Sequence, residues 1–206
     1  MIDAWIVFRR GLGLWRRHIV ALTLVSLTWA ALSLTILLLP PATAGLYAIA
    51  NRIAYGEPPR AEHFFAGARR YSALSFRWAL VNLAAGGLFY AGYSVDGPPT
   101  LARALLLLAL GGWIAAQFYT WPLLLEMPRK RLFPALRTAL LLALVAPLYS
   151  LALLWGAALV VLAATEIAAP LGPLAAGFVA LVGNLGAIER LAAYGRTPDP
   201  RSARLY

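Results

Sequence analysis

The chain has 206 residues, of which 62% are hydrophobic and only 13% are charged, and its mean hydropathy is +0.74. A soluble domain carries about 25% charged residues, so these proportions exclude an ordinary water-exposed globule and favour an integral membrane protein. The net charge of +10 comes from clusters between apolar runs, a placement typical of membrane proteins rather than of nucleic-acid binding.

The N-terminal segment predicts an interfacial amphipathic helix over residues 1–18, with Trp5, Phe8, Leu12 and Trp15 at helical spacing. The following apolar run, residues 19–39, is too long for the apolar part of a secretory signal and is interpreted as an uncleaved membrane helix. Pro40 and Pro41 are expected to stop this helix, and Pro41 to start the next one.

Six membrane helices are predicted in an all-α, polytopic bundle that forms a single membrane domain over residues 1–206. The predicted segments are 19–39, 41–55, 72–93, 101–125, 134–165 and 171–191, followed by a cytoplasmic tail at 192–206. Pro147 is expected to kink the fifth helix. The second segment is short, and a re-entrant hairpin remains an alternative to a full span.

The distribution of basic residues indicates that the chain returns to its starting side of the membrane before Arg60. With six segments crossing, every basic residue except Arg103 lies on the side of the N-terminus. The positive-inside tendency therefore places both termini in the cytoplasm, in what is expected to be a bacterial inner membrane.

Residues 48–60 and 187–201 are similar in sequence. In each segment an apolar helix ends at a Tyr-Gly pair, and a basic loop that contains proline follows. Similar exit chemistry explains this similarity better than an internal duplication does, because tyrosine anchors and glycine caps recur for physical reasons.

The stretch from Leu37 to Leu80 resembles the signature region of the YesL-like family of bacterial integral membrane proteins, whose function is unknown. The resemblance rests on a proline-led helix start, a basic residue, a Gly-Glu pair, a Phe-Phe pair and a basic stretch. The positions that carry it include Pro41, Thr43, Arg52, Gly56, Glu57, Phe64, Phe65, Arg69 and Arg70. The resemblance implies a small multi-helix membrane protein and no reaction. Pro40 departs from the glycine that is usual before the first proline.

Arg52 and Glu57 are interpreted as an interfacial clamp, with phosphate or headgroup binding as the alternative. The segment with Phe64, Phe65, Arg69 and Arg70 is expected to lie in plane against the headgroups, or to dock a cytoplasmic partner.

Catalytic motifs and intramembrane ionisable groups are missing, so we expect no enzyme, no cofactor and no metal site. The chain has no cysteine and two histidines. The polar residues at depth are Asn82, Gln117 and Asn184, which are expected either to bond neighbouring helices or to line a solute path.

The favoured function is that of an accessory or scaffold subunit whose partners are the lipid bilayer and another membrane protein or a second copy. The alternative is a small permease or channel for an uncharged solute such as a sugar.

Overall fold

The computed structural model describes residues 4–94, 100–167 and 175–195, and within these ranges the chain is all-helical, as predicted. The elements are α1 (Ala4–Arg17), α2 (Ile19–Ser33), the 3-10 turn η1 (Ile36–Leu38), α3 (Leu39–Ala54), α4 (Ala61–Arg70), α5 (Ser72–Ser94), α6 (Thr100–Glu126), α7 (Leu132–Val145), α8 (Pro147–Ile167) and α9 (Ala175–Ala193).

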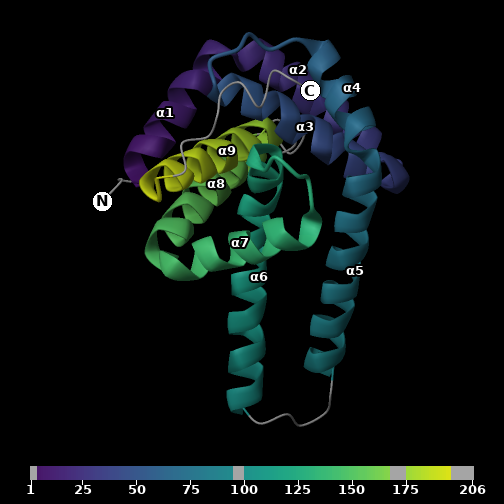
Figure 1. Ribbon diagram of the computed structural model, residues 1–206, viewed down its shortest axis with the longest axis vertical. Coiled ribbons are helices and arrows are strands. Elements are labelled where there is room, and N and C mark those ends of the chain that lie inside the picture. The colour runs from purple at the N-terminus through teal and green to yellow at the C-terminus, as the bar shows by residue number, and fades with distance from the viewer. Residues whose placement is uncertain (1–3, 95–99, 168–174, 196–206) are drawn as a thin grey trace.

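The helices form a packed body from which one long hairpin projects. Figure 1 shows α5 and the first half of α6 extending away from the body, while the other helices gather around the far end of α6. Helix α9 contacts α1, α2, α3, α6 and α8, so it lies at the centre of the body. Most of α9 is buried, including Phe178, Leu181 and Asn184.

A backbone-to-side-chain bond fixes α9 against α2. The Gly177 N–H donates to Ser26 Oγ at 3.0 Å, and Ser26 is fully buried. A buried donor without a partner is costly, so this bond helps to determine where the first turn of α9 meets α2.

Helix α1 packs on α9 through only part of the apolar stripe that the sequence predicts. Phe8 and Trp15 both make edge-on contacts with Phe178, at centroid distances of 5.5 and 6.1 Å. Trp5, by contrast, is 60% exposed and Leu12 is 37% exposed. The stripe thus divides into one side that packs on the body and one that faces outward.

Four helical segments in the described parts of the chain are long and apolar enough to cross a bilayer, which indicates a membrane protein. They are Ile36–Ala54, Thr100–Glu126, Pro147–Glu166 and Ala175–Ala193. Helix α2 is apolar but has only 15 residues, a length of about 22 Å against a hydrocarbon core of about 30 Å. The count of six spans and the re-entrant alternative therefore remain predictions.

The first break in the chain lies earlier than predicted. Helix α2 ends at Ser33, not at the prolines, and around this end Ser33 and Thr35 donate side-chain hydrogen bonds to the carbonyls of Trp29 and Leu32, both at 2.7 Å. Such hydroxyl bonds compete with regular helix hydrogen bonding. Pro40 and Pro41 instead occupy the first turn of α3, where a missing N–H costs nothing.

The predicted fifth helix, residues 134–165, is two helices rather than one kinked helix. Helix α7 ends at Val145, and Ala146 has φ −137° and ψ 70°, outside the helical region. A residue before proline is disfavoured in helical geometry because of a clash with the proline ring. Pro147 therefore separates α7 from α8 completely. The predicted sixth helix begins at residue 171, outside the described residues, and α9 extends two residues beyond its predicted end at 191.

The predicted tail at 192–206 is described only as far as residue 195. Both Tyr-Gly exits have their glycine in the left-handed region, with φ 80° at Gly56 and 70° at Gly195. This shared geometry is the one that glycine caps require.

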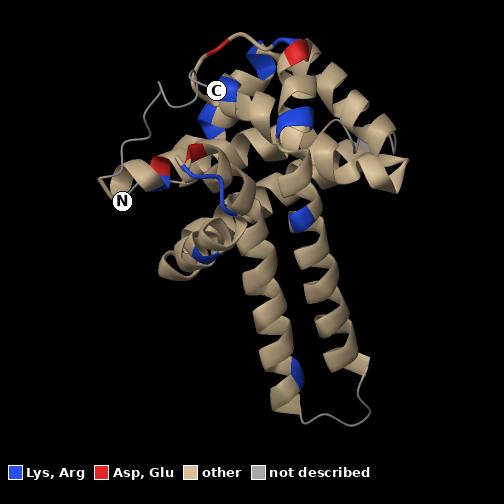
Figure 2. Ribbon diagram, turned by 45° about the vertical axis from the view of Figure 1, so that its right-hand side comes forward, with Lys and Arg blue, Asp and Glu red and all other residues tan. Residues whose placement is uncertain are grey.

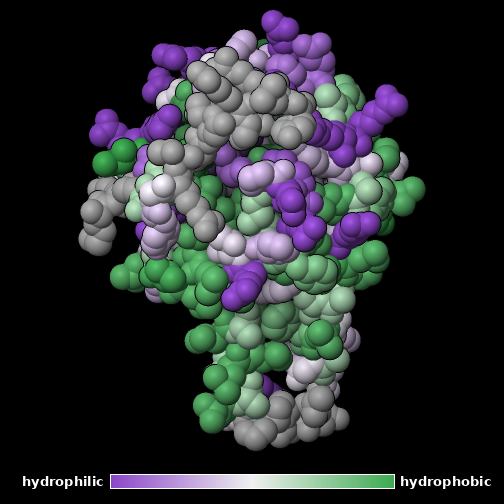
Figure 3. Space-filling model, viewed as in Figure 1, coloured by the Kyte–Doolittle hydropathy of each residue, from purple (hydrophilic) through white to green (hydrophobic). Residues whose placement is uncertain are grey.

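Charge and hydropathy divide the molecule along its long axis. Figure 2 shows most basic and acidic segments on the body, and Figure 3 shows hydrophilic residues over the body and hydrophobic ones over the hairpin. Arg103 lies near the start of α6, at the free end of the hairpin (Figure 1). Most charge therefore lies at one end of the molecule, while the body also contains apolar helices of membrane-spanning length in α3, α8 and α9.

Candidate functional site

A tight turn joins α3 to the segment that leads into α4. Gly56 has φ 80°, a left-handed value that glycine adopts without strain. The turn lets the Glu57 N–H donate to the Arg52 carbonyl at 2.9 Å, and the two side chains form an ion pair at 3.0 Å. The predicted clamp residues are therefore in direct contact.

Two glycines allow α4 to lie almost on the backbone of α3. A β-carbon on Gly67 would lie 2.5 Å from Ala48 Cβ, and one on Gly45 would lie 2.6 Å from the Phe64 carbonyl oxygen. Both distances are too short for real side chains, so only glycine permits this approach. The close packing brings the basic residues of the two helices together.

A cavity of about 80 Å³ lies between α3, α4, the end of α6 and the loop that follows it; we call it the basic pocket. Its walls carry three cationic side chains and no carboxylate among the described residues. The lining residues are Ala48, Asn51, Arg52, His63, Ala66, Gly67, Arg70, Tyr71, Leu125 and Lys130. Cations that share one cavity repel each other unless an anion compensates them.

Two carboxylates beside the basic pocket already accept hydrogen bonds from neighbouring side chains. Glu57 pairs with Arg52. Glu126 accepts from Asn51 Nδ2 at 2.7 Å and from the Tyr55 hydroxyl at 2.8 Å. Asn51 Nδ2 also donates to Asn184 Oδ1 at 3.1 Å, so one polar network joins α3, α6 and α9 beside the pocket.

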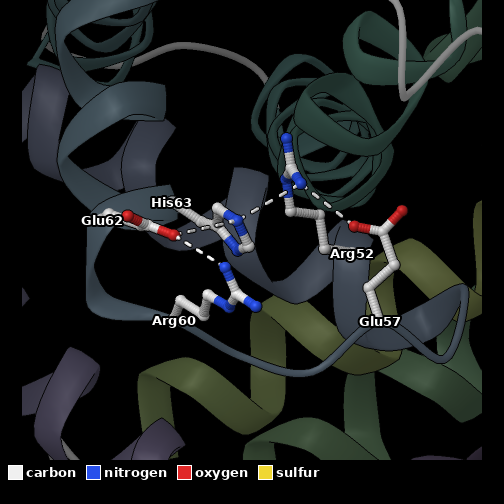
Figure 4. A network of polar contacts seen from close by, with 5 residues as sticks. All are labelled: Arg52, Glu57, Arg60, Glu62 and His63. Carbon is white, nitrogen blue, oxygen red and sulfur yellow. Dashed lines mark hydrogen bonds and ion pairs between the residues drawn. The ribbon is translucent and has the colours of Figure 1, made fainter.

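His63 lies at the edge of this arrangement. Figure 4 shows the His63 ring and the Arg52 side chain pointing toward each other, with Nε2 and Nη1 3.5 Å apart and Glu57 on the other side of Arg52. Glu62 Oε1 lies 3.9 Å from the same ring nitrogen and 3.4 Å from Arg60 Nη1. Burial, followed by the positive charge of Arg52, lowers the pKa of His63, so the neutral ring is favoured.

Lys130 reaches the basic pocket from the loop after α6. Its ammonium donates to the Leu125 carbonyl at 2.5 Å. Burial lowers the pKa of Lys130, while the carboxylate of Glu126 acts in the opposite direction and Arg70 adds to the lowering. The loop thus holds a partly desolvated cation in the pocket that Arg52 and Arg70 also line.

The remaining residues of the predicted family motif surround the same helices. Thr43 accepts a 3.1 Å hydrogen bond from Trp29 Nε1 and so links α3 to α2, while Pro41 lies in the first turn of α3. Phe64 is buried under α3, and Phe65 is 55% exposed on the outer side of α4. Arg69 and Arg70 are both exposed, but only Arg70 lines the basic pocket.

The three amides that are predicted to lie within the membrane do not form one set. Asn82 and Gln117 join α5 to α6: Asn82 Nδ2 donates to Gln117 Oε1 at 3.3 Å, and Trp78 Nε1 donates to the same oxygen at 2.8 Å. Trp113 Nε1 donates to Asn82 Oδ1 at 3.2 Å. Asn184, in contrast, belongs to the network of Asn51 and Glu126.

A cavity of about 570 Å³ beside Gln117 is lined mainly by apolar side chains of α6 and α8, and its lining includes neither Asn82 nor Asn184. The amides therefore bond neighbouring helices, and this cavity does not connect the three of them.

Sequence reasoning missed the residues that complete the basic pocket. Asn51, His63 and Lys130 line the pocket from separate parts of the chain, and Glu126 lies beside it as the partner of Asn51. The available signal was Glu126, the one acidic residue in the 27 residues of α6, because a carboxylate at the end of an apolar helix needs donors nearby.

Fold and charge distribution together define an all-helical membrane protein with a basic pocket at the charged end. Comparison of the chain with models of protein families, with curated proteins and with solved structures finds no match. Across the described ranges, no group of three or more His, Asp or Glu side chains is arranged to hold a metal ion.

Proposed function

We propose that the protein is a non-enzymatic accessory or scaffold subunit of a membrane complex in the bacterial inner membrane, with both termini in the cytoplasm. We also propose membership of the YesL-like family, on the motif residues given above. The observation that carries the functional proposal is the projecting hairpin of α5 and α6, which leaves large apolar surfaces outside the body (Figure 1).

The hairpin carries glycines that contact nothing in the described chain. A β-carbon at Gly86, Gly87, Gly111 or Gly112 would have no neighbour within 4 Å. Open glycines let another helix approach closely, and close packing drives helix association where the hydrophobic effect does not act. These positions therefore suit a helix of another membrane protein.

The amides of the hairpin support the same proposal. Asn82 and Gln117 bond each other and the flanking tryptophans, so they brace the two helices. The second candidate, a permease for an uncharged solute, requires a polar path along the amides. Its support is weaker because Asn184 is buried in a separate network.

The test is gentle extraction of the protein at native abundance, followed by mass spectrometry of what co-purifies. We expect a stoichiometric membrane protein. The double variant Gly86→Leu/Gly111→Leu fills the open glycine positions and should release that protein while remaining monodisperse in detergent.

Two matched variants serve as controls. Gly86→Ala adds a single methyl group, and Ala84→Leu adds leucine at another exposed position of α5. Both should retain the partner. Equal recovery of the partner with the double leucine variant would contradict the proposal, and a bound sugar without a partner protein would favour the permease.

A further inference from the structure

We propose that the basic pocket is a binding site for a phosphate group, carried either by a lipid headgroup or by a small soluble phosphate compound. This proposal is independent of the accessory function, because the residues that carry it lie on the body and not on the hairpin.

The charge of the basic pocket favours an anion. Arg52, Arg70 and Lys130 line one small cavity, and its lining includes none of the neighbouring carboxylates Glu57, Glu62 and Glu126. Like charges that share a cavity destabilise each other, and Lys130 is partly desolvated there. A bound phosphate would offset this repulsion, and burial of Lys130 would then strengthen rather than weaken the site.

The donors of the basic pocket suit phosphate oxygens. A lysine ammonium has three donors, and the only bond that Lys130 makes to the described residues is the one to the Leu125 carbonyl. Arg52 holds both Glu57 and His63 through Nη1 alone, and a guanidinium has further N–H groups. Guanidinium and ammonium donors together form charge-assisted bonds to phosphate.

The volume of the pocket permits a phosphate group. The cavity of about 80 Å³ exceeds the roughly 10–15 Å³ that one water needs, so it has room for a group larger than a single water molecule.

The basic pocket lies where lipid headgroups can reach it. Leu125 lies in the last turn of α6, a helix of membrane-spanning length, and Lys130 follows in the next loop. The pocket therefore lies at the end of a span, where lipid phosphates are found, and basic pockets between membrane helices bind anionic headgroups. The exposed ring of Phe65 on the outer side of α4 is suited to the same interface.

The test uses the full-length protein in maltoside micelles, which contain no phosphate, with the NMR signals of the His63 ring as the reporter. The chain has two histidines, so a His18→Gln background leaves one ring to observe. Inorganic phosphate and a short-chain phosphatidylglycerol are titrated separately at constant ionic strength. We expect at least one of them to shift the His63 signals saturably.

Two pairs of variants separate the pocket from general basicity. Arg70→Gln and Lys130→Gln remove lining cations and should weaken binding at least about tenfold, the loss expected for one charge-assisted bond. Arg69→Gln and Arg129→Gln remove neighbouring charges that do not line the pocket and should leave binding unchanged. Lys130→Arg should retain binding, which shows that the charge rather than the fold is at issue.

Saturation by phosphate with competition between the two probes would identify the phosphate group itself as the ligand chemistry. Saturation by the lipid alone would support the proposal with a headgroup as the source. No saturable shift with either probe would overturn it, as would equal weakening by all four glutamine variants.

Discussion

Asn51 Nδ2 lies 2.7 Å from Glu126 Oε1, so an amide on α3 meets a carboxylate at the end of α6, 75 residues along the chain. The same amide nitrogen reaches Asn184 on α9. One side chain therefore connects three helices that are distant in sequence.

Replacing Asn51 should destabilise the body more than replacing an amide of the hairpin. Asn51→Ala removes the donor to Glu126 Oε1 and to Asn184 Oδ1, although Tyr55 still donates to the other oxygen of Glu126, and we expect a loss of about 1–3 kcal/mol. Asn82→Ala should cost about 0.6 kcal/mol, the average for a side-chain bond between membrane helices. Thermal unfolding midpoints in detergent measure both, and equal shifts would contradict this role for Asn51.

The close packing of α3 and α4 can be tested by exchanging methyl groups across it. Gly67→Ala places a β-carbon 2.5 Å from Ala48 Cβ and should lower the free energy of unfolding by about 1–3 kcal/mol. The double variant Gly67→Ala/Ala48→Gly should recover part of this loss, because the clashing methyl group is gone.

Gly13→Ala is the control, since a β-carbon there has no neighbour within 4 Å. It should be neutral or stabilise α1 by up to about 1 kcal/mol through better helix propensity. Destabilisation equal to that of Gly67→Ala would show that glycine flexibility, and not close packing, is what matters.

Stability should fall as the pH drops through the range in which His63 titrates. The folded protein lowers the pKa of His63, and the charged groups around the ring are Arg52, Glu62, Arg60 and Glu57. The unfolded chain, with a histidine pKa near 6.5, then binds more protons, so stability is complete above about pH 6.5 and declines below it.

His63→Gln should reduce this decline, as measured by unfolding midpoints between about pH 7.5 and 5.5. His18→Gln serves as the control and should retain the wild-type slope. Identical slopes for wild type and His63→Gln would exclude His63 as the cause.

Reporter fusions at positions 18, 62, 97, 130, 168 and 206 test the predicted threading. We expect these sites to alternate as inside, inside, outside, inside, outside, inside, because the basic clusters then share one side. An outside signal at 62 or 130 would contradict the six-span prediction. The 14-residue α7 need not cross for this pattern, since α8 alone has the length of a span.

Composition and apolar runs predict the all-helical membrane class, and most helix positions follow from the same runs. The ends of helices were harder to predict, because α2 ends at Ser33, seven residues before Pro40. Proline marks where a helix cannot continue, and it does not show that a helix has already ended earlier in the chain.

The site could be predicted only where its partners are close in sequence. Arg52 and Glu57 are five residues apart, so their pairing was a natural expectation. His63 joins them because Gly45 and Gly67 let α4 approach α3, and Lys130 comes from the loop after α6. Contacts between segments this far apart in the sequence leave no local pattern. The basic pocket therefore became visible only in the folded arrangement.

Helix α9 has a consequence for how the protein is made. It is synthesised after all the other described helices, yet α1, α2 and α3 pack directly on it. While the ribosome is still translating the middle of the chain, these early segments have no centre to assemble around, and the Ser26 hydroxyl lacks its Gly177 partner. Chains that stop short of α9 should therefore be prime substrates for membrane quality-control proteases.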